Sequence, residues 1–280
     1  MSVVLAALDT TDVARAVLAT ATRFGLLTRA DVEAVFVRAN PPGPGTSPEW
    51  LATGADVPFH LLDGPVESTL LEALGPDEVI GAVIGARATP RGPGAVGHTA
   101  LHVLEHTQKP VMVVPPGLEE AATGPFRRLL VPLEGTESSS HAVLERLRPL
   151  LVTDVELVVL HVFNDDTRPV MLDRPEEDLA ILGRQFLIDH FPRPARIELC
   201  YGPVAERVVE ASRDHASDLI VLSWSQDGSP GRARTVRESL ESSRVPVLLL
   251  PATHGPGDGP RESRGGPDRD EGDPRPGSTT

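Results

Sequence analysis

The chain repeats itself, and this repetition constrains the fold more strongly than any other feature of the sequence. The run VVLAALDTT begins at Val3 and matches RLLVPLEGT, which begins 125 residues later at Arg128. The run LLDGPVESTLLEAL begins at Leu61 and matches LCYGPVAERVVEAS, which begins 138 residues later at Leu199. Three more blocks match in the same order. Five ordered matches at nearly constant spacing indicate a tandem duplication of one structural unit.

Each unit alternates short apolar runs with amphipathic segments. The runs are rich in Val, Leu and Ile and are about five to seven residues long, as expected for buried parallel strands. Helical patterns of about 12 to 15 residues lie between several of them, and each half therefore reads β-α-β-β-α-β-α-β. This order predicts an α/β fold, with a parallel sheet covered by helices on both faces. A ligand is expected at the carboxyl ends of the strands, where the strand order reverses.

The repeats also suggest the domain boundaries. We expect a first domain at residues 1–116 and a second at residues 127–251, joined by a Pro/Gly/Glu linker at residues 117–126. Residues 252–280 contain no large apolar side chain. Such a segment cannot bury enough surface to offset the entropy lost on ordering, so a disordered tail is predicted. Residues 39–50 are predicted to form a loop between the second and third strands.

Composition excludes several classes of function. The net charge of −14 argues against binding to duplex nucleic acid, which needs a basic surface. No apolar run approaches the ~20 residues of a membrane helix, and the N-terminus does not resemble a secretory signal. The single cysteine, Cys200, lies in an apolar run and is expected to be buried and inert. We therefore expect a cytoplasmic protein with neither nucleic acid nor membrane as a partner.

Residues 84–116 contain a motif that could carry function. An apolar run is followed by a loop rich in Gly, Pro and Arg, a helical pattern from about His98, and a second apolar run. Many α/β proteins hold phosphate this way, because the free N–H groups and the dipole of a helix N-terminus attract an anion. Thr99 would cap the helix or bind a phosphate oxygen.

The same loop has a structural interpretation as well as the phosphate-binding one. In the phosphate-binding interpretation, Arg87 would supply positive charge to the phosphate. However, Gly, Pro and Arg are common in any exposed connection, and Pro90 and Pro93 remove N–H donors where a phosphate would need them. Two interpretations therefore remain open: the loop binds a nucleotide, or it only connects the strand to the helix.

Three histidines recur every four residues after this loop. His98, His102 and His106 share one helical face, a spacing that can bind zinc. The opposite arc is apolar, which predicts that the histidines face water and hold no metal. His98 remains a candidate for direct contact with an anion, because it stands at the helix start.

Catalysis has little support in the sequence. There is no Gly-x-Ser-x-Gly, no His-Glu-x-x-His and no complete P-loop lysine motif. Asp9 follows the first strand but lacks an identifiable partner base, so it suits orienting a ligand better than acid–base chemistry. We therefore do not expect an enzyme, and slow nucleotide hydrolysis is a remote alternative.

The repeated blocks resemble universal stress protein domains, in the tandem two-domain type common in actinobacteria. Four features carry the resemblance: the acid after the first strand, the GPV that opens a helix, the GAR…GHT loop and the closing KPVMVV strand. The resemblance implies two Rossmann-like (adenine nucleotide alpha hydrolase-like) sandwiches, each with a five-stranded parallel sheet. It further implies that the last strands pair the halves as an intramolecular pseudo-dimer. Pairing of whole chains through those strands is open.

One branch of this family binds ATP through Gly, two residues, Gly, nine residues, Gly, then Ser or Thr. The resemblance places the ligand-holding positions of the first half at Asp9, Val37 (the backbone position for adenine), Gly85, Gly97 and Thr99. Ala88 replaces the second glycine, eight residues follow instead of nine, and His98 takes the hydroxyl position.

The second half departs further from the family pattern. Glu134 keeps the acid, but Ser223, Gln226 and Ala233 stand at the three glycine positions, and Arg234 takes the hydroxyl position. Side chains there would crowd the backbone away from a triphosphate. The resemblance thus implies a stress-response regulatory or protective module that binds ATP or AMP in the first half only, with Mg²⁺ only alongside the nucleotide. The alternative is an interaction or scaffold protein without a ligand.

Overall fold

The computed structural model describes residues 1–39, 49–86, 96–116, 118, 124–133, 143, 145–150, 154–163, 195–224 and 232–251. Most of the predicted linker and the whole predicted tail at residues 252–280 lie outside this set. The boundaries of the two domains stay predictions.

The first half follows the predicted order of elements, with one addition. Its elements are β1 (Val3–Ala7), α1 (Val13–Thr28), β2 (Asp31–Arg38), α2 (Glu49–Gly54), β3 (Phe59–Asp63), α3 (Val66–Leu74), β4 (Val79–Gly85), α4 (His98–His106) and β5 (Val111–Val114). The prediction of a loop at residues 39–50 was wrong for its last two residues, because Glu49 and Trp50 begin α2. Ala52 is fully buried and anchors this short helix, and Glu49 suits its N-terminal turn.

The second half has the same succession of strands among its described residues. Its elements are β6 (Arg128–Leu133), the 3₁₀ turn η1 (Arg148–Leu150), β7 (Glu156–Phe163), β8 (Ala195–Tyr201), α7 (Val204–Asp214), β9 (Leu219–Trp224), α8 (Arg232–Ser242) and β10 (Val247–Pro251).

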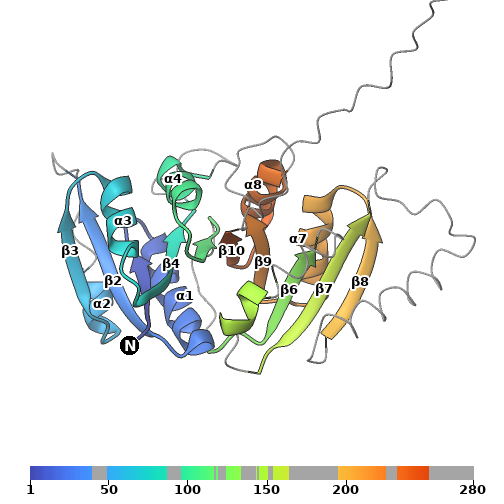
Figure 1. Ribbon diagram of the computed structural model, residues 1–280, viewed down its shortest axis with the longest axis horizontal. Helices are drawn as coiled ribbons and strands as arrows, with labels where there is room; N and C mark the ends of the chain where they lie inside the picture. The colour runs from blue at the N-terminus through green and yellow to red at the C-terminus, as the bar shows by residue number, and fades with distance from the viewer. Residues whose placement is uncertain are drawn as a thin grey trace, which may run out of the picture.

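The ten strands among the described residues form one sheet in the order β3-β2-β1-β4-β5-β10-β9-β6-β7-β8 (Figure 1). Neighbouring strands are parallel except at the centre, where β5 and β10 pair antiparallel, with Met112 opposite Leu248. Each half thus has its first strand between its second and fourth, and its last strand at the centre. The predicted α/β fold is confirmed. The two five-stranded sheets are continuous rather than separate, because β5 and β10 join them.

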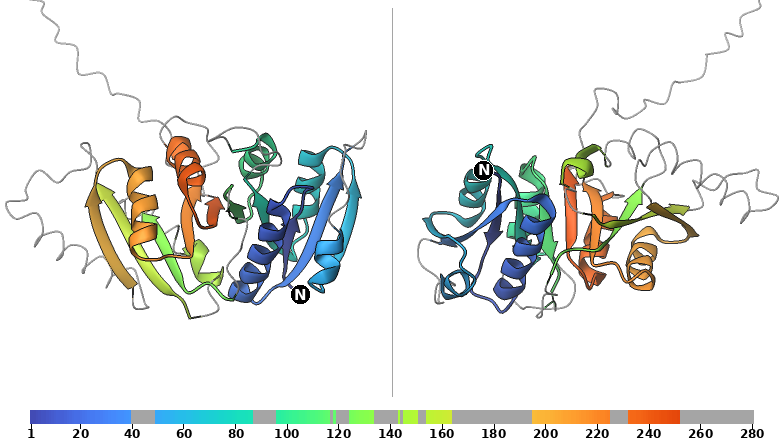
Figure 2. Two further views of the ribbon diagram at one scale, coloured as in Figure 1. Left: turned by 180° about the vertical axis from the view of Figure 1, so that it is seen from behind. Right: turned by 90° about the horizontal axis from the view of Figure 1, so that it is seen from below.

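Helices cover both faces of the sheet (Figure 2). The chain leaves β1 in one direction through α1 to β2, and crosses in the other direction through α3 to β4, so these helices lie on opposite faces. Side chains alternate along each strand accordingly: Val4 and Ala6 pack with α1, whereas Val3 and Leu5 pack in the cluster that includes α3 and α4. Helices α7 and α8 pack in this second cluster as well.

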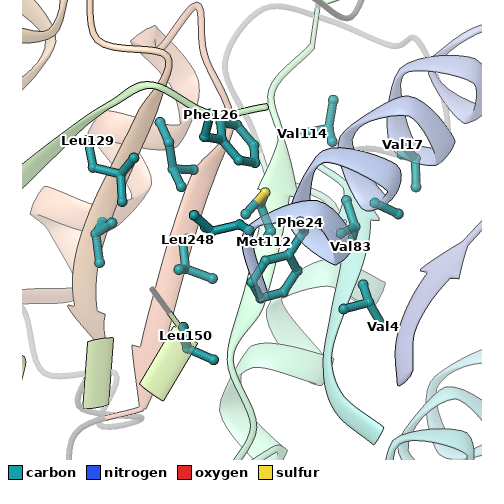
Figure 3. Packing of buried hydrophobic residues seen from close by; sticks show 14 of the residues in the cluster. Val4, Val17, Phe24, Val83, Met112, Val114, Phe126, Leu129, Leu150 and Leu248 are labelled. Atoms are coloured by element: carbon teal, nitrogen blue, oxygen red, sulfur yellow. The ribbon is translucent and has the colours of Figure 1, made fainter. Parts of the chain in front are cut away.

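The core is continuous across the two halves. Figure 3 shows Phe24 from α1 and Met112 from β5 beside Leu248 of β10 and Phe126, which precedes β6. All four side chains are buried. The junction between the halves is therefore part of a hydrophobic core and not a surface contact between two finished domains.

Candidate functional site

The candidate site lies at the carboxyl ends of the central strands of the first half. β1 pairs with β2 on one side and with β4 on the other, with Ala7 opposite Ile84. Asp9 lies two residues beyond Ala7, Gly85 is the last residue of β4, and Val37 is next to last in β2. The strand order reverses between β1 and β4, which is where ligands of open α/β sheets bind.

The N-terminus of α4 also lies at this edge of the sheet. The helix begins at His98 with Gly97 as its N-cap, and the Gly97 N–H donates to the Ala86 carbonyl oxygen at 2.7 Å. This bond holds the start of α4 against the end of β4. Gly97 has φ −68° and ψ 153°, which any residue adopts. A glycine is therefore needed here only if something approaches the backbone closely.

Asp9 is held by its own loop. Its Oδ1 accepts hydrogen bonds from the Thr11 N–H at 2.8 Å and from Thr11 Oγ1 at 2.6 Å. Burial raises the pKa of the Asp9 carboxyl, and the bonds from Thr11 partly oppose this. A hydrogen bond from the backbone of Asp9 itself also lowers this pKa. The two bonds from Thr11 to Oδ1 thus fix the side chain at the end of β1.

Glu67 is a residue of the site that sequence reasoning missed. It lies in the first turn of α3. Thr99 Oγ1 donates to Glu67 Oε1 at 3.0 Å, and His98 Nδ1 lies 3.4 Å from the same oxygen. A hydrogen bond from its own backbone N–H lowers the pKa of Glu67, and those from Thr99 and His98 add to this. The GPVE run marks Glu67 only as a helix-start residue, and its contact with α4 follows from packing 31 or 32 residues away along the chain.

This contact changes the electrostatics of the predicted phosphate position. The hydroxyl of Thr99, which was expected to cap the helix or bind a phosphate oxygen, donates to a carboxylate instead. An ionised Glu67 stands where the helix dipole favours an anion. A phosphate at the start of α4 would meet this negative charge.

Of the remaining residues predicted for the site, the structure describes Val37 but not those of the Gly/Pro/Arg-rich loop. The Val37 side chain is buried in the core, and Val37 pairs with Leu62 of β3, so only its backbone could contact a ligand. Arg87 and Ala88 lie outside the described residues, as do Pro90 and Pro93.

The three histidines form a stacked row along α4. The ring centroids of His98 and His102 are 6.1 Å apart, and those of His102 and His106 are 4.2 Å apart. The His98 side chain is 85% exposed. The buried residues of α4 are Ala100, Val103 and Leu104, on the predicted apolar arc. No group of three or more His, Cys, Asp or Glu side chains is placed to hold a metal ion in the part of the chain that the structure describes.

The corresponding edge of the second half is used for packing. Ser223 stands in β9 at the position of Gly85, and the next residue, Trp224, is buried. Its Nε1 donates to the Leu104 carbonyl oxygen at 3.2 Å, which ties β9 to α4 of the first half. Glu134 and Gln226 lie outside the described residues. A large ring thus takes the place that Ala86 has in the first half.

Cys200 is less buried than expected. It lies in β8, an edge strand of the sheet, and its side chain is only half-buried. Burial still raises the pKa of the thiol, which disfavours the reactive thiolate.

Across the described ranges, no helix is both long and apolar enough to cross a membrane.

Comparison with known proteins relates the second half of the chain to one family. Residues 125–251 match the model of the universal stress protein family. No curated protein matches the chain. Among solved structures, a universal stress protein from Archaeoglobus fulgidus DSM 4304 superposes with a TM-score of 0.61 at 13% identity, over 89% of this chain and 96% of that one.

A functionally unknown protein from Pseudomonas aeruginosa PAO1 superposes with a TM-score of 0.65 at 11% identity, over 90% of this chain and 93% of that one. At such identities the likeness concerns the fold alone, and it extends over both halves. The family-model match shows that residues 125–251, the second half of the chain, are similar to the universal stress protein family, in agreement with the predicted resemblance there.

Proposed function

We propose that this chain is a stress-response regulatory or protective module of the cytoplasm whose first half binds an adenine nucleotide, ATP or AMP. The observation that carries the proposal is the 2.7 Å hydrogen bond from the Gly97 N–H to the Ala86 carbonyl, which places the N-terminus of α4 at the end of β4. A helix N-terminus at the point where the strand order reverses suits a phosphate. Asp9, on the adjacent strand end, offers its carboxylate to a hydroxyl of the nucleoside.

Isothermal titration of the full-length protein with ATP, AMP and cyclic AMP tests the proposal. We expect heat of binding with ATP or AMP, and its loss in Gly97→Val, because a branched side chain would hold the phosphate away from the backbone. Gly54→Val is the matched control. Gly54 ends α2, far from the strand ends, and an added Cβ would meet no atom within 4 Å. Absence of heat with all three nucleotides would contradict the proposal.

One observation favours a second candidate, an interaction or scaffold module without a ligand. Glu67 already accepts the Thr99 hydroxyl, so the start of α4 is satisfied without a phosphate. Trp224 likewise uses the strand end of the second half for packing. The titration separates the two candidates. Slow nucleotide hydrolysis, the remote alternative, requires phosphate release above that of Gly85→Val.

A further inference from the structure

The outer surface of the first half carries a groove that the nucleotide proposal does not use. It lies between α1, α2 and the chain at Gly124, and its volume is about 470 Å³. Its apolar lining consists of Leu18, Ala19, Leu26, Trp50 and Ala55. Figure 2 shows α1 and α2 on the same side of the sheet. Small-molecule sites have volumes of roughly 300–1,000 Å³ and are mostly apolar, so this groove has a suitable size and chemistry.

Large apolar side chains are exposed along the groove. Trp50 is 60% exposed and Leu26 is 51% exposed. Ala19, Thr22 and Leu26 follow one another along the outer face of α1. The hollow of the groove thus lies over the small side chains of Ala19 and Thr22, beside the large apolar side chains of Leu26 and Trp50. Exposed apolar surface around a concave site is typical of a place where another molecule binds.

The groove also contains two arginines, and only one of them has a charged partner among the described residues. Arg23 is buried, lies 3.6 Å from a carboxylate oxygen of Asp218, and donates from Nε to the Gly124 carbonyl at 2.9 Å. The exposed Arg15 has its guanidinium carbon 5.5 Å from the centroid of the Trp50 ring. Within the described ranges no carboxylate pairs with it. In a chain of net charge −14, Arg15 is therefore a local cation able to select an anion.

We propose that this groove binds a small hydrophobic carboxylate. The carboxylate accepts hydrogen bonds from the planar guanidinium of Arg15, and the apolar body packs on Ala19, Leu26 and Trp50. The site shares no residue with the nucleotide site, so the two proposals stand or fall separately.

Isothermal titration of the full-length protein with 2-naphthoate tests the proposal, with the uncharged 2-naphthamide as the comparison ligand. We expect 2-naphthoate to bind more tightly. Arg15→Gln should weaken 2-naphthoate about tenfold, because a charge-assisted bond is lost, and should leave 2-naphthamide nearly unchanged. Arg29→Gln is the matched control, since Arg29 is an exposed arginine at the C-cap of α1 outside the groove. It should change neither affinity.

Ala19→Trp locates the site, because its ring would fill the hollow. We expect this variant to lose binding of both ligands while keeping the far-UV circular dichroism of the wild type. The proposal would be overturned by no binding of 2-naphthoate up to about 1 mM, by binding that survives Ala19→Trp, or by an unchanged affinity of the Arg15→Gln variant. Binding of an acidic amphipathic peptide without binding of 2-naphthoate would also overturn it.

Discussion

At the scale of single residues, Glu67 and Asp9 determine what the candidate site can hold. Both are acids, and they approach it from different elements: Asp9 follows β1, and Glu67 lies in the first turn of α3. Asp9 is partly desolvated, which raises its pKa, whereas Glu67 is stabilised as an anion, which lowers its pKa. Asp9 is therefore suited to bind a hydroxyl of a ligand, whereas the negative charge of Glu67 repels a phosphate.

Glu67→Gln should strengthen nucleotide binding. Removing a negative charge near a phosphate relieves a repulsion of about 1 kcal/mol at a partly exposed site, which corresponds to roughly a fivefold gain in affinity for ATP or AMP. The measurement is a calorimetric titration beside Glu72→Gln, which removes an exposed acid from the same helix. A loss of affinity in Glu67→Gln would mean that the carboxylate contributes to the ligand site.

Asp9→Asn should stabilise the folded protein at neutral pH. Because the pKa of Asp9 is raised on folding, its neutral form is favoured in the folded state. Its contribution to stability is therefore fully present below the unfolded pKa, about 3.8, and is lost as pH rises through the folded pKa. Asn stays neutral and can still accept from Thr11. We expect the melting temperature to rise by roughly 1–3 °C at pH 7.

The same comparison at pH 3 controls for other effects of the substitution. The difference between wild type and Asp9→Asn should vanish there, since the Asp9 carboxyl is then protonated in both states. Asp154→Asn, at an exposed acid, should change little at either pH. A destabilised Asp9→Asn at pH 7 would show that the charged carboxylate is itself stabilising.

At the scale of elements, the repeated GPV run has a structural cause. Gly64 has φ +151° and Gly202 has φ +132°, and each is followed by a proline that forms the N-cap, of α3 and α7 respectively. Positive φ is costly for residues with a Cβ, and proline suits the start of a helix. The motif turns the chain from a strand into a helix in both halves, which is why it recurs.

Gly202→Ala should therefore destabilise the protein by about 1–3 kcal/mol, because alanine is strained at this φ. An added Cβ would also lie 3.0 Å from Nε of Arg207. Urea unfolding measures the change. Gly54→Ala, where an added Cβ meets no atom within 4 Å, is the control and should have little effect or stabilise. Equal stability of the two variants would contradict the proposed role of Gly202.

Sequence reasoning found the features that repeat or follow a period, and missed those that depend on contacts between distant elements. The succession of strands along each half and the start of α4 near His98 followed from apolar runs and the duplication. By contrast, α2 (Glu49–Gly54) was not predicted, and its first two residues fall within the loop expected at residues 39–50. The contacts of Glu67 with Thr99 and of Trp224 with Leu104 join residues 32 and 120 positions apart, which no local pattern encodes.

At the scale of the whole molecule, the two last strands occupy the centre of the sheet. β5 pairs with β4 and β10, and β10 pairs with β5 and β9, so neither strand has a free edge. The strands at the ends of the sheet are β3 and β8. Arg23 and Asp218, 3.6 Å apart, add an ion pair between the halves.

We therefore expect the protein to be a monomer in solution, because pairing of two chains through the last strands would require opening this centre. Size-exclusion chromatography with light scattering should give a mass near the 29.8 kDa of one chain. A mass of about twice this value, retained on dilution, would contradict the expectation and would direct attention to the edge strands β3 and β8.

We propose that one half of this internally repeated chain binds nucleotide and that the other does not. The most direct measurement is the stoichiometry of ATP or AMP binding by isothermal titration, with the matched substitutions Gly97→Val in the first half and Ala233→Val at the corresponding position of the second. The proposal predicts one site per chain, lost in Gly97→Val and kept in Ala233→Val. No binding, two sites per chain, or a single site lost only in Ala233→Val would contradict it.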